Sequence, residues 1–390
     1  MENIRSQFLL NPEVTHLNHG SFGACPKPIF EDYQKWQLEL EKNTFNFFVK
    51  QGPILLEKSR EALGNFIGCD KDDVVYTMNP SYALNIVIKD FGLKPGDEIL
   101  TTDLEYGAMD RTWNYYCKQA GAKYVRQHIS LPIVSKEQIV EEFFKGLTSK
   151  TKAIFISHIT STTALRLPVE EICKRAKAEG LITIVDGAHV PGHIDLNLQE
   201  LEADIYTGAC HKWLLTPKGC SFLYVKKEFQ PFNPLLISWG FESEMPSDSQ
   251  FIDHHQLQGT RDYSAFLTVP AALKFRDNND WNTVAANCRK LAQSNYQRFA
   301  DVTGGSLLCP LSDDFLGQMC SLSIPCPDPV ALQELLYDKY RIEIPVMPHD
   351  DKVFIRYSIN GYHSQTDLDV LFSALEEIRN STDLLKQPSC

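Results

Sequence analysis

The chain has 390 residues, of which 43% are hydrophobic and 23% charged, as is ordinary for a globular protein. Its net charge of −12 disfavours a nucleic-acid-binding surface. No apolar stretch approaches the roughly 20 residues of a membrane span, and we expect neither a membrane segment nor a secretion signal. The eleven cysteines are scattered without C-x-x-C spacing, so we expect reduced thiols, no metal site and a cytoplasmic location.

Short apolar runs alternate with amphipathic stretches between residues 60 and 225. The apolar runs predict seven strands, at residues 73–78, 97–102, 122–130, 152–158, 181–186, 203–208 and 220–225. Helix-like stretches lie between some of them, at residues 81–92, 109–121 and 169–180. This alternation predicts βαβ units, and therefore an α/β fold whose mostly parallel sheet is covered by helices on both faces.

The pattern changes after residue 226. Residues 231–251 are rich in Pro and aromatic side chains, which predicts a long functional loop. Two helices are then predicted, from about Ser264 to Phe275 and from Trp281 to Phe299.

The C-terminal part of the chain predicts a smaller α+β domain. Strand candidates lie at residues 320–325 and 353–359, and helix candidates at residues 329–340 and 365–378. We expect the N-terminal segment to complete this domain. The predicted division assigns residues 1–20 to the small domain and the active site, 21–275 to a large domain and 276–390 to the small domain.

Two segments carry the strongest functional signal. LITIVDGAHV (181–190) predicts a buried strand that ends at Asp186, and GACHKWL (208–214) places Lys212 just after the next strand. Sheets of this type bind ligands outside the carboxyl ends of their strands. A lysine and a carboxylate in these places suit pyridoxal 5'-phosphate (PLP), with the lysine forming a Schiff base and the aspartate holding the pyridine nitrogen protonated. The alternatives are a solvated surface lysine and an aspartate that caps a helix.

Further polar residues follow other predicted strands. Ser81 in NPSYALN (79–85) opens a helix, whose free N–H groups attract phosphate. Tyr106 in DLEYGA (103–108) is placed to stack on the pyridine ring. Ser161, in HITSTTALRLP (158–168), and His189 are placed to bond the phenolic oxygen. The alternatives are an ordinary capping sequence, a core tyrosine, a Ser/Thr turn and a hydrogen-bonded core histidine.

These motifs resemble those of fold-type I PLP enzymes of the class V aminotransferase family, in the branch that is isopenicillin N epimerase-like and cysteine desulfurase-like. The resemblance covers roughly residues 15–380. It is carried by LNHGSFGACP (17–26), NPSYALN, LEYGA, HITSTTALRLPVEEI, VDGAHVPG, YTGACHKWL, GTRDYSAF (259–266) and IRYSINGY (355–362). It implies a large domain with a seven-stranded sheet and a smaller α+β domain.

The resemblance also implies roles for single residues. Lys212 is expected to be the Schiff-base lysine and proton shuttle, and Tyr106 takes a ring-stacking position that is a histidine in many relatives. The other implied cofactor contacts are Ser81, Tyr82, Ser161, Asp186, His189 and His211.

Substrate and subunit contacts follow from the same resemblance. Arg356 resembles the arginine that binds the substrate α-carboxylate, a task that suits its planar fork of donors. Asn18 and His19 are expected in the substrate pocket. Thr260 resembles a threonine that reaches the phosphate of the neighbouring subunit, which implies a homodimer.

The sequence departs from the family pattern at three places. Ala209 stands where relatives often have a serine that touches phosphate, and Pro80 lacks an N–H, so we expect altered phosphate anchoring but not its loss. Residues 340–358 contain no cysteine, whereas cysteine desulfurases of this family carry a persulfide-forming cysteine in that loop. Desulfuration through a persulfide is therefore not expected.

The resemblance thus implies a PLP-dependent enzyme that acts at the α-carbon of an amino acid or an amino-acid-derived substrate. Epimerase-like chemistry is the leading hypothesis, with Tyr106 as the candidate second acid/base. A C–S β-lyase that lacks a catalytic cysteine and a class V aminotransferase are the alternatives, and a non-catalytic PLP-binding relative is the least favoured. Arg166 and the loop around Trp239 are hypothesised to select the distal end of the substrate.

Overall fold

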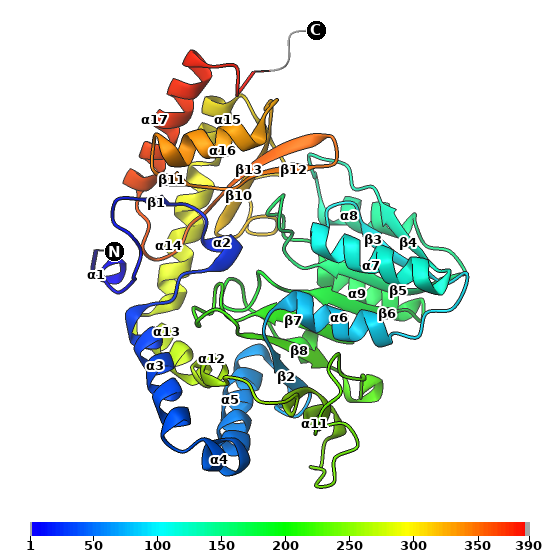
Figure 1. The fold of residues 1–390 in the computed structure, drawn as a ribbon. Coiled ribbons are helices and arrows are strands. Elements are labelled where there is room, and N and C mark those ends of the chain that lie inside the picture. The colour runs from blue at the N-terminus through cyan, green and yellow to red at the C-terminus, as the bar shows by residue number, and fades with distance from the viewer. Residues whose placement is uncertain (1, 387–390) are drawn as a thin grey trace.

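A seven-stranded sheet forms the centre of the larger part of the protein, which the computed structural model describes for residues 2–386 (Figure 1). The strand order is β2-β8-β7-β6-β5-β3-β4. β8 is antiparallel to both of its neighbours, and the remaining pairs are parallel. The strands are β2 (Val74–Thr77), β3 (Glu98–Thr102), β4 (Lys123–Gln127), β5 (Thr151–Ser157), β6 (Ile182–Asp186), β7 (Ile205–Ala209) and β8 (Ser221–Val225). The predicted α/β fold with a mostly parallel sheet is confirmed.

Helices cover both faces of this sheet, because its strands are apolar on both sides. On β5, Ile154 and Ile156 belong to one apolar cluster, which also contains residues of the helices α8 and α9. Ala153 and Phe155, which point to the other face, belong to a second cluster with residues of α6 and α7. Such continuous apolar strands are typical of buried parallel sheets. The covering helices are α5 (Gly52–Ile67), α6 (Pro80–Asp90), α7 (Gly107–Ala120), α8 (Lys136–Phe144), α9 (Val169–Ala178), α10 (Leu198–Leu201) and α11 (Gln250–Gln256).

A smaller antiparallel sheet lies beside the first, with the strand order β12-β13-β10-β9 (Figure 1). Its strands are β9 (Ser306–Leu307), β10 (Met319–Ile324), β12 (Val346–His349) and β13 (Lys352–Ser358), and its helices are α15 (Tyr296–Thr303), α16 (Pro329–Asp338) and α17 (Gln365–Ser381). β1 (Thr15–His16) pairs with β11 (Ile342–Glu343), so the N-terminal segment runs along this part of the structure. The division at residues 20 and 275 remains a prediction.

Two predicted helices are each broken in the structure. The stretch from Ser264 forms two helices, α12 (Ser264–Leu267) and α13 (Val269–Asn278). Pro270 lies in the first turn of α13, where a backbone N–H makes no hydrogen bond within the helix and its absence costs nothing. The stretch from Trp281 forms α14 (Trp281–Ser294) and then α15. The helix breaks at Asn295, because its side-chain amide donates to the Leu291 carbonyl at 2.9 Å and so competes with the backbone N–H groups for this acceptor.

The sequence did not predict the helices that precede the large sheet. These are α1 (Glu2–Arg5), α2 (His19–Phe22), α3 (Lys27–Lys42) and α4 (Thr44–Asn46), followed by α5. Within residues 2–386, none of the helices combines the length and the hydrophobicity that a bilayer crossing requires.

Candidate active site

The carboxyl ends of β5, β6 and β7 lie side by side, and they bring the predicted site residues to one edge of the sheet. Ser157, Asp186 and Thr207 are neighbours across these three strands. Lys212 follows β7 after a tight turn, in which the N–H groups of Cys210 and His211 both donate to the Cys220 carbonyl at 3.1 Å. The sequence therefore places the lysine beside the strand that ends at the aspartate.

The Lys212 amine is partly buried and has no carboxylate partner among the described residues. Among residues 2–386 its hydrogen-bond neighbour is His189, whose Nε2 lies 3.4 Å from Nζ, and no acidic group lies within 4.0 Å. Burial lowers the pKa of Lys212 from 10.5 to about 7; the charge of Arg356 lowers it too, and that of Asp186 opposes the shift. At neutral pH about half of these amines carry a free electron pair, which is what a nucleophile or a proton acceptor requires.

His189 is buried and neutral, and its contacts fix which nitrogen bears the proton. Trp213 donates its indole N–H to Nδ1 at 3.5 Å. Burial, assisted by the charges of Lys212 and Arg356, holds the pKa of His189 well below its usual value. A neutral imidazole has one N–H, so Nε2 carries it and can donate to the Lys212 amine or to a ligand oxygen beside it.

Asp186 ends β6 as a buried carboxylate, and it has one acceptor oxygen to spare. Oδ1 accepts the Ala188 N–H at 2.9 Å, and within residues 2–386 the carboxylate makes no other hydrogen bond. Burial raises its pKa, although the Ala188 N–H and the Lys212 charge act in the opposite direction. A buried acceptor of this kind is suited to a protonated ring nitrogen.

Glu105 is a buried carboxylate at the same edge that the sequence did not single out. It accepts hydrogen bonds from the Thr102 hydroxyl at 2.7 Å and from the Ser157 N–H and hydroxyl at 3.0 and 2.5 Å. Burial raises its pKa to about 8. These bonds pin the loop after β3 to β5, and so fix the position of Tyr106, which is the next residue and is 45% exposed. The available signal was a charged residue directly after Leu104, just beyond the apolar strand β3.

The start of α6 offers donors for an anion. Asn79 caps this helix by accepting the Tyr82 N–H at 2.8 Å, and Pro80 has no N–H to give. The Ser81 N–H and hydroxyl therefore remain available among the described residues. The Tyr82 hydroxyl donates instead to Gln258 at 3.1 Å.

His211, predicted to contact phosphate, braces the turn before Lys212. Its Nδ1 donates to the Cys220 carbonyl at 2.8 Å, and burial lowers its pKa to about 4. Its Nε2 is then an acceptor at neutral pH, which does not suit a phosphate oxygen.

Arg356, on β13, brings the small sheet to the site. It is 1% exposed, and it donates from Nη1 to the Ser161 carbonyl and from Nη2 to the Ser21 hydroxyl at 3.1 Å. Its Nε is buried without a partner in the described residues, and burial lowers its pKa to about 10 while leaving it charged. A buried guanidinium with an unused donor is suited to a ligand carboxylate.

The N-terminal segment closes over the turn that carries Lys212. Gly23 has a φ of 71°, and a Cβ there would lie 2.0 Å from the His211 carbonyl oxygen, so glycine is required for this approach. The buried His19 ring lies 3.1 Å from the Lys212 carbonyl and 3.1 Å from the Tyr362 hydroxyl. His19 thus contacts the Lys212 backbone from the N-terminal side.

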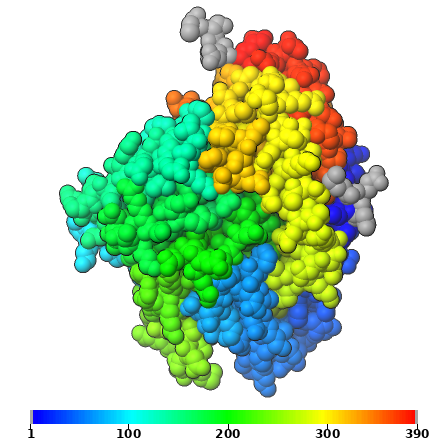
Figure 2. All heavy atoms as spheres, turned by 180° about the vertical axis from the view of Figure 1, so that it is seen from behind, coloured from blue at the N-terminus to red at the C-terminus, as the bar shows by residue number. Residues whose placement is uncertain are grey.

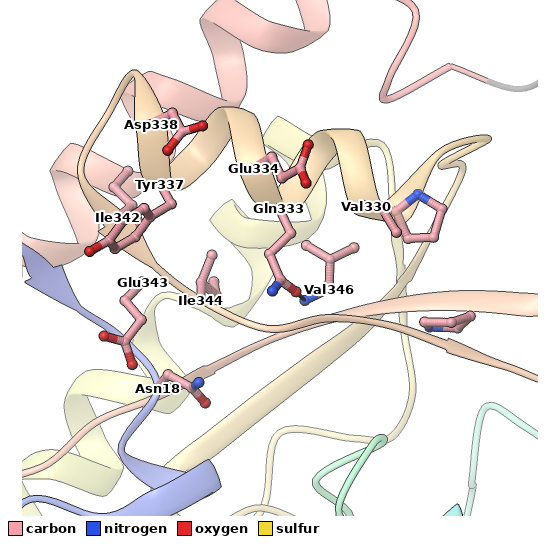
Figure 3. A pocket seen from close by; sticks show the side chains of 12 residues that line it. Asn18, Val330, Gln333, Glu334, Tyr337, Asp338, Ile342, Glu343, Ile344 and Val346 are labelled. Carbon is pink, nitrogen blue, oxygen red and sulfur yellow. Dashed lines mark hydrogen bonds between the residues drawn. The ribbon is translucent and has the colours of Figure 1, made fainter.

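Three other predicted residues each line a separate groove or cavity, and Trp239 lies on the surface. Asn18 accepts the Ser21 hydroxyl and lines a groove of about 370 Å³ below α16, across from Gln333 and Tyr337 (Figure 3). Thr260 is exposed in a groove beside Phe45 and Val49. Arg166 lines a different cavity, with Arg276 and Arg289, whereas Trp239 is 80% exposed in the loop before α11. The structure therefore does not bring Arg166 and Trp239 together.

The residues at this edge fit PLP. A buried amine without an ion-pair partner faces a donor imidazole, and a carboxylate with a spare oxygen lies one strand away. An anion-attracting helix start and an exposed tyrosine complete the set. Lys212 and Asp186 would hold the two ends of the aromatic ring, and Ser81 the phosphate.

Comparison with known proteins agrees with this geometry. The family model described as aminotransferase class V matches residues 30–371. The chain belongs to this family. The assignment confirms that the protein is a PLP-dependent enzyme, as the sequence predicts.

Individual relatives span nearly the whole chain. The isopenicillin N epimerase of Amycolatopsis lactamdurans is 32% identical over 390 residues, which cover 96% of this chain and 98% of that protein. An L-cysteine desulfhydrase of Arabidopsis thaliana is 27% identical and covers 85% of this chain, with 77% of its own length matched. The structure of a cysteine desulfurase from Thermococcus onnurineus NA1 shares the fold, with a TM-score of 0.80, 22% identity and 97% of each chain covered.

Proposed function

We propose that this enzyme acts at the α-carbon of an amino acid or an amino-acid-derived substrate, and that it inverts the configuration there. The observation that carries the proposal is the Lys212 amine, which lies 3.4 Å from His189 Nε2 and has no carboxylate within 4.0 Å among residues 2–386. Burial lowers its pKa to about 7, so it can both take and return a proton near neutral pH. The charge of Arg356 also lowers that pKa, and a carboxylate bound to Arg356 would weaken this effect.

The site residues divide the work between binding and proton transfer. PLP, when bound, stabilises negative charge at the α-carbon of an attached amino acid. Arg356 holds the substrate carboxylate through its free Nε–H, and Lys212 Nζ removes or returns the α-proton on one face. Asp186 keeps the ring nitrogen protonated, and the N–H at His189 Nε2 donates to the phenolic oxygen.

Inversion requires an acid on the other face of the substrate, and Tyr106 is the candidate. Its position is fixed by the hydrogen bonds of Glu105, and its ring is 45% exposed at the carboxyl edge of the sheet. The resemblance to isopenicillin N epimerases at 31–32% identity over 96–97% of the chain favours this reading.

The second candidate is a C–S β-lyase, which several relatives named L-cysteine desulfhydrase favour at 25–30% identity. Both reactions begin with removal of the α-proton by Lys212. They differ in the second step, because a lyase expels a β-substituent whereas an epimerase returns a proton. Residues 340–358 supply no cysteine to accept sulfur, so a lyase of this kind would release a thiol or sulfide.

A panel of L- and D-amino acids and cysteine conjugates in D₂O separates the candidates. Inversion predicts a product of opposite configuration that carries deuterium at the α-carbon, without pyruvate, and lyase chemistry predicts pyruvate and ammonia. Lys212→Ala should abolish both. If neither product forms with any substrate while Lys212→Ala changes nothing, the proposal is wrong.

The subunit arrangement is also part of the proposal. Thr260 lies in a groove of about 610 Å³ whose rim includes the exposed apolar side chains Phe45 and Val49. A second copy of the chain that covers these side chains would carry Thr260 to the neighbouring phosphate. We expect a particle of twice 44.3 kDa in analytical ultracentrifugation, a monomer for Val49→Asp, and weaker PLP retention for Thr260→Ala in an intact dimer. A wild-type monomer that retains PLP would contradict this arrangement.

A cytoplasmic location completes the proposal. The cysteines within residues 2–386 are all unpaired, as is typical of proteins in a reducing compartment.

A further inference from the structure

A second cavity lies behind the turn that carries Lys212, and we call it the arginine cavity. It has a volume of about 510 Å³ and opens where α5, α13, α14 and the segment 192–196 meet. Blue, green and yellow surfaces join on this face of the molecule in Figure 2. Its charged lining consists of Arg166, Arg276, Arg289, Asp195 and Asp313, and the ring of His193 also contributes.

The arginines of this cavity have few acceptors within the protein. Arg276 is 8% exposed, and its one hydrogen bond runs from Nη1 to the Trp213 carbonyl at 3.1 Å. Among residues 2–386, neither Arg276 nor Arg289 has a carboxylate within 4.0 Å, and Arg289 makes no hydrogen bond. Arg166 touches Glu170 at 3.6 Å, and Asp313 accepts from Gln293 instead.

A buried charge without a partner is costly, and proteins normally pair it. Burial lowers the pKa of Arg276 to about 10, although the charges of Asp277 and Asp195 act in the opposite direction, so it is still charged at neutral pH. The cavity therefore presents guanidinium donors around a hollow large enough for a small molecule. The lining carries three arginines against two aspartates, whereas the chain as a whole has a net charge of −12.

The arginine cavity touches the catalytic turn through Trp213, the residue after Lys212. The His193 ring stacks on the Trp213 ring with centroids 4.0 Å apart, and Trp213 in turn donates to His189. His193 is fixed in place by the Gln318 N–H, which donates to its Nε2 at 2.6 Å. Arg276 donates to the Trp213 carbonyl, so a ligand that orders Arg276 would also hold this carbonyl, one residue beyond the catalytic lysine.

We propose that the arginine cavity binds a small multivalent anion, a phosphate or a dicarboxylate, at a site distinct from that of PLP and substrate. Both kinds of anion offer the paired oxygens that guanidinium groups bind in a bidentate manner. Arg276 and Arg289 bind the anion, and the His193–Trp213 stack connects it to the Lys212 turn.

Isothermal titration calorimetry of the PLP-loaded enzyme tests this inference, because the PLP phosphate then occupies its own site. Sodium phosphate and sodium succinate are titrated separately at constant ionic strength set by chloride. We expect saturable binding of at least one, which identifies the preferred kind of anion. Arg289→Gln should weaken it roughly 10- to 100-fold, as the loss of one charge-assisted hydrogen bond predicts. Arg298→Gln is the matched control, since Arg298 is a surface arginine whose Nη1 lies 2.6 Å from Asp369 Oδ1. This variant should bind the anion as tightly as the wild-type enzyme does.

Hydrogen–deuterium exchange locates the site independently of the variants. The anion should slow exchange in the segment 192–196 and around Trp213, and should leave residues 231–251 unchanged. Absence of saturable binding for both anions would overturn the proposal. Equal binding by wild type and Arg289→Gln would do so as well, as would protection confined to other segments.

Discussion

Burial is the main cause of the low pKa of Lys212, and two opposing charges adjust it; each charge can be removed alone. Arg356→Gln removes the cation that lowers the pKa of Lys212, and Asp186→Asn removes the anion that raises it. We expect the wild-type apo-protein to capture PLP with a midpoint near pH 7, Arg356→Gln with a higher midpoint and Asp186→Asn with a lower one. Substrate binding plays no part in this step, so the role of Arg356 towards the substrate does not affect the comparison.

The size of these effects follows from the structure. With a pKa of about 7, roughly half of the Lys212 amines are neutral at pH 7, whereas about one in 3,000 would be neutral at the ordinary value of 10.5. Removing one nearby charge in an environment of intermediate dielectric should move the midpoint by about 1–2 pH units.

The assay is stopped-flow absorbance after apo-protein is mixed with PLP, over about pH 5 to 10, which spans the pKa values of shifted and ordinary lysines. Free lysine treated in the same way corrects for the titration of PLP itself. A wild-type rate that keeps rising to pH 10, or two variants whose midpoints move in the same direction, would refute this explanation of the pKa of Lys212.

Four other outcomes test the roles of single residues. Arg356→Lys should raise the KM for amino-acid substrates roughly 10- to 100-fold, since an ammonium cannot reproduce the guanidinium fork. An unchanged KM in steady-state assays would exclude Arg356 as the group that binds the substrate carboxylate. Tyr106→Phe should slow inversion while α-deuterium exchange persists. Glu105→Ala should lower the free energy of unfolding in urea by about 1–3 kcal/mol, because the donors of Ser157 lose their acceptor. Between about pH 7 and 10.5 the apo-protein should gain stability as pH rises, because the unfolded chain retains the Lys212 proton over that range; Lys212→Met should lose this slope.

Much of the fold and the centre of the site could be predicted because their signals are local. The seven strands are continuous apolar runs; Asp186 ends one of them, and Lys212 lies three positions after the end of the next. Parallel strands end at the same edge, so two residues 26 positions apart were expected to meet. The strand positions were accordingly confirmed, whereas the roles of the individual site residues stay predictions.

The residues that the sequence did not reveal depend on distant partners. Glu105 is buried because Ser157, from another strand, supplies its donors, and no local pattern encodes that pairing. Arg276 lies on a helix, where a charged residue normally indicates a solvent-exposed face, yet it is 8% exposed because α13 packs against the backbone at Trp213. The break at Asn295 likewise depends on a side-chain contact that competes with the helix.

The link between Lys212 and PLP can be measured directly by mass spectrometry. The PLP-loaded protein is reduced with borohydride and digested, and the peptide that carries the cofactor is identified. We expect the modification on Lys212, and none on Lys218, which lies six positions further along the chain. A cofactor attached to any other lysine, or a protein that binds PLP without a reducible bond, would contradict the site described above.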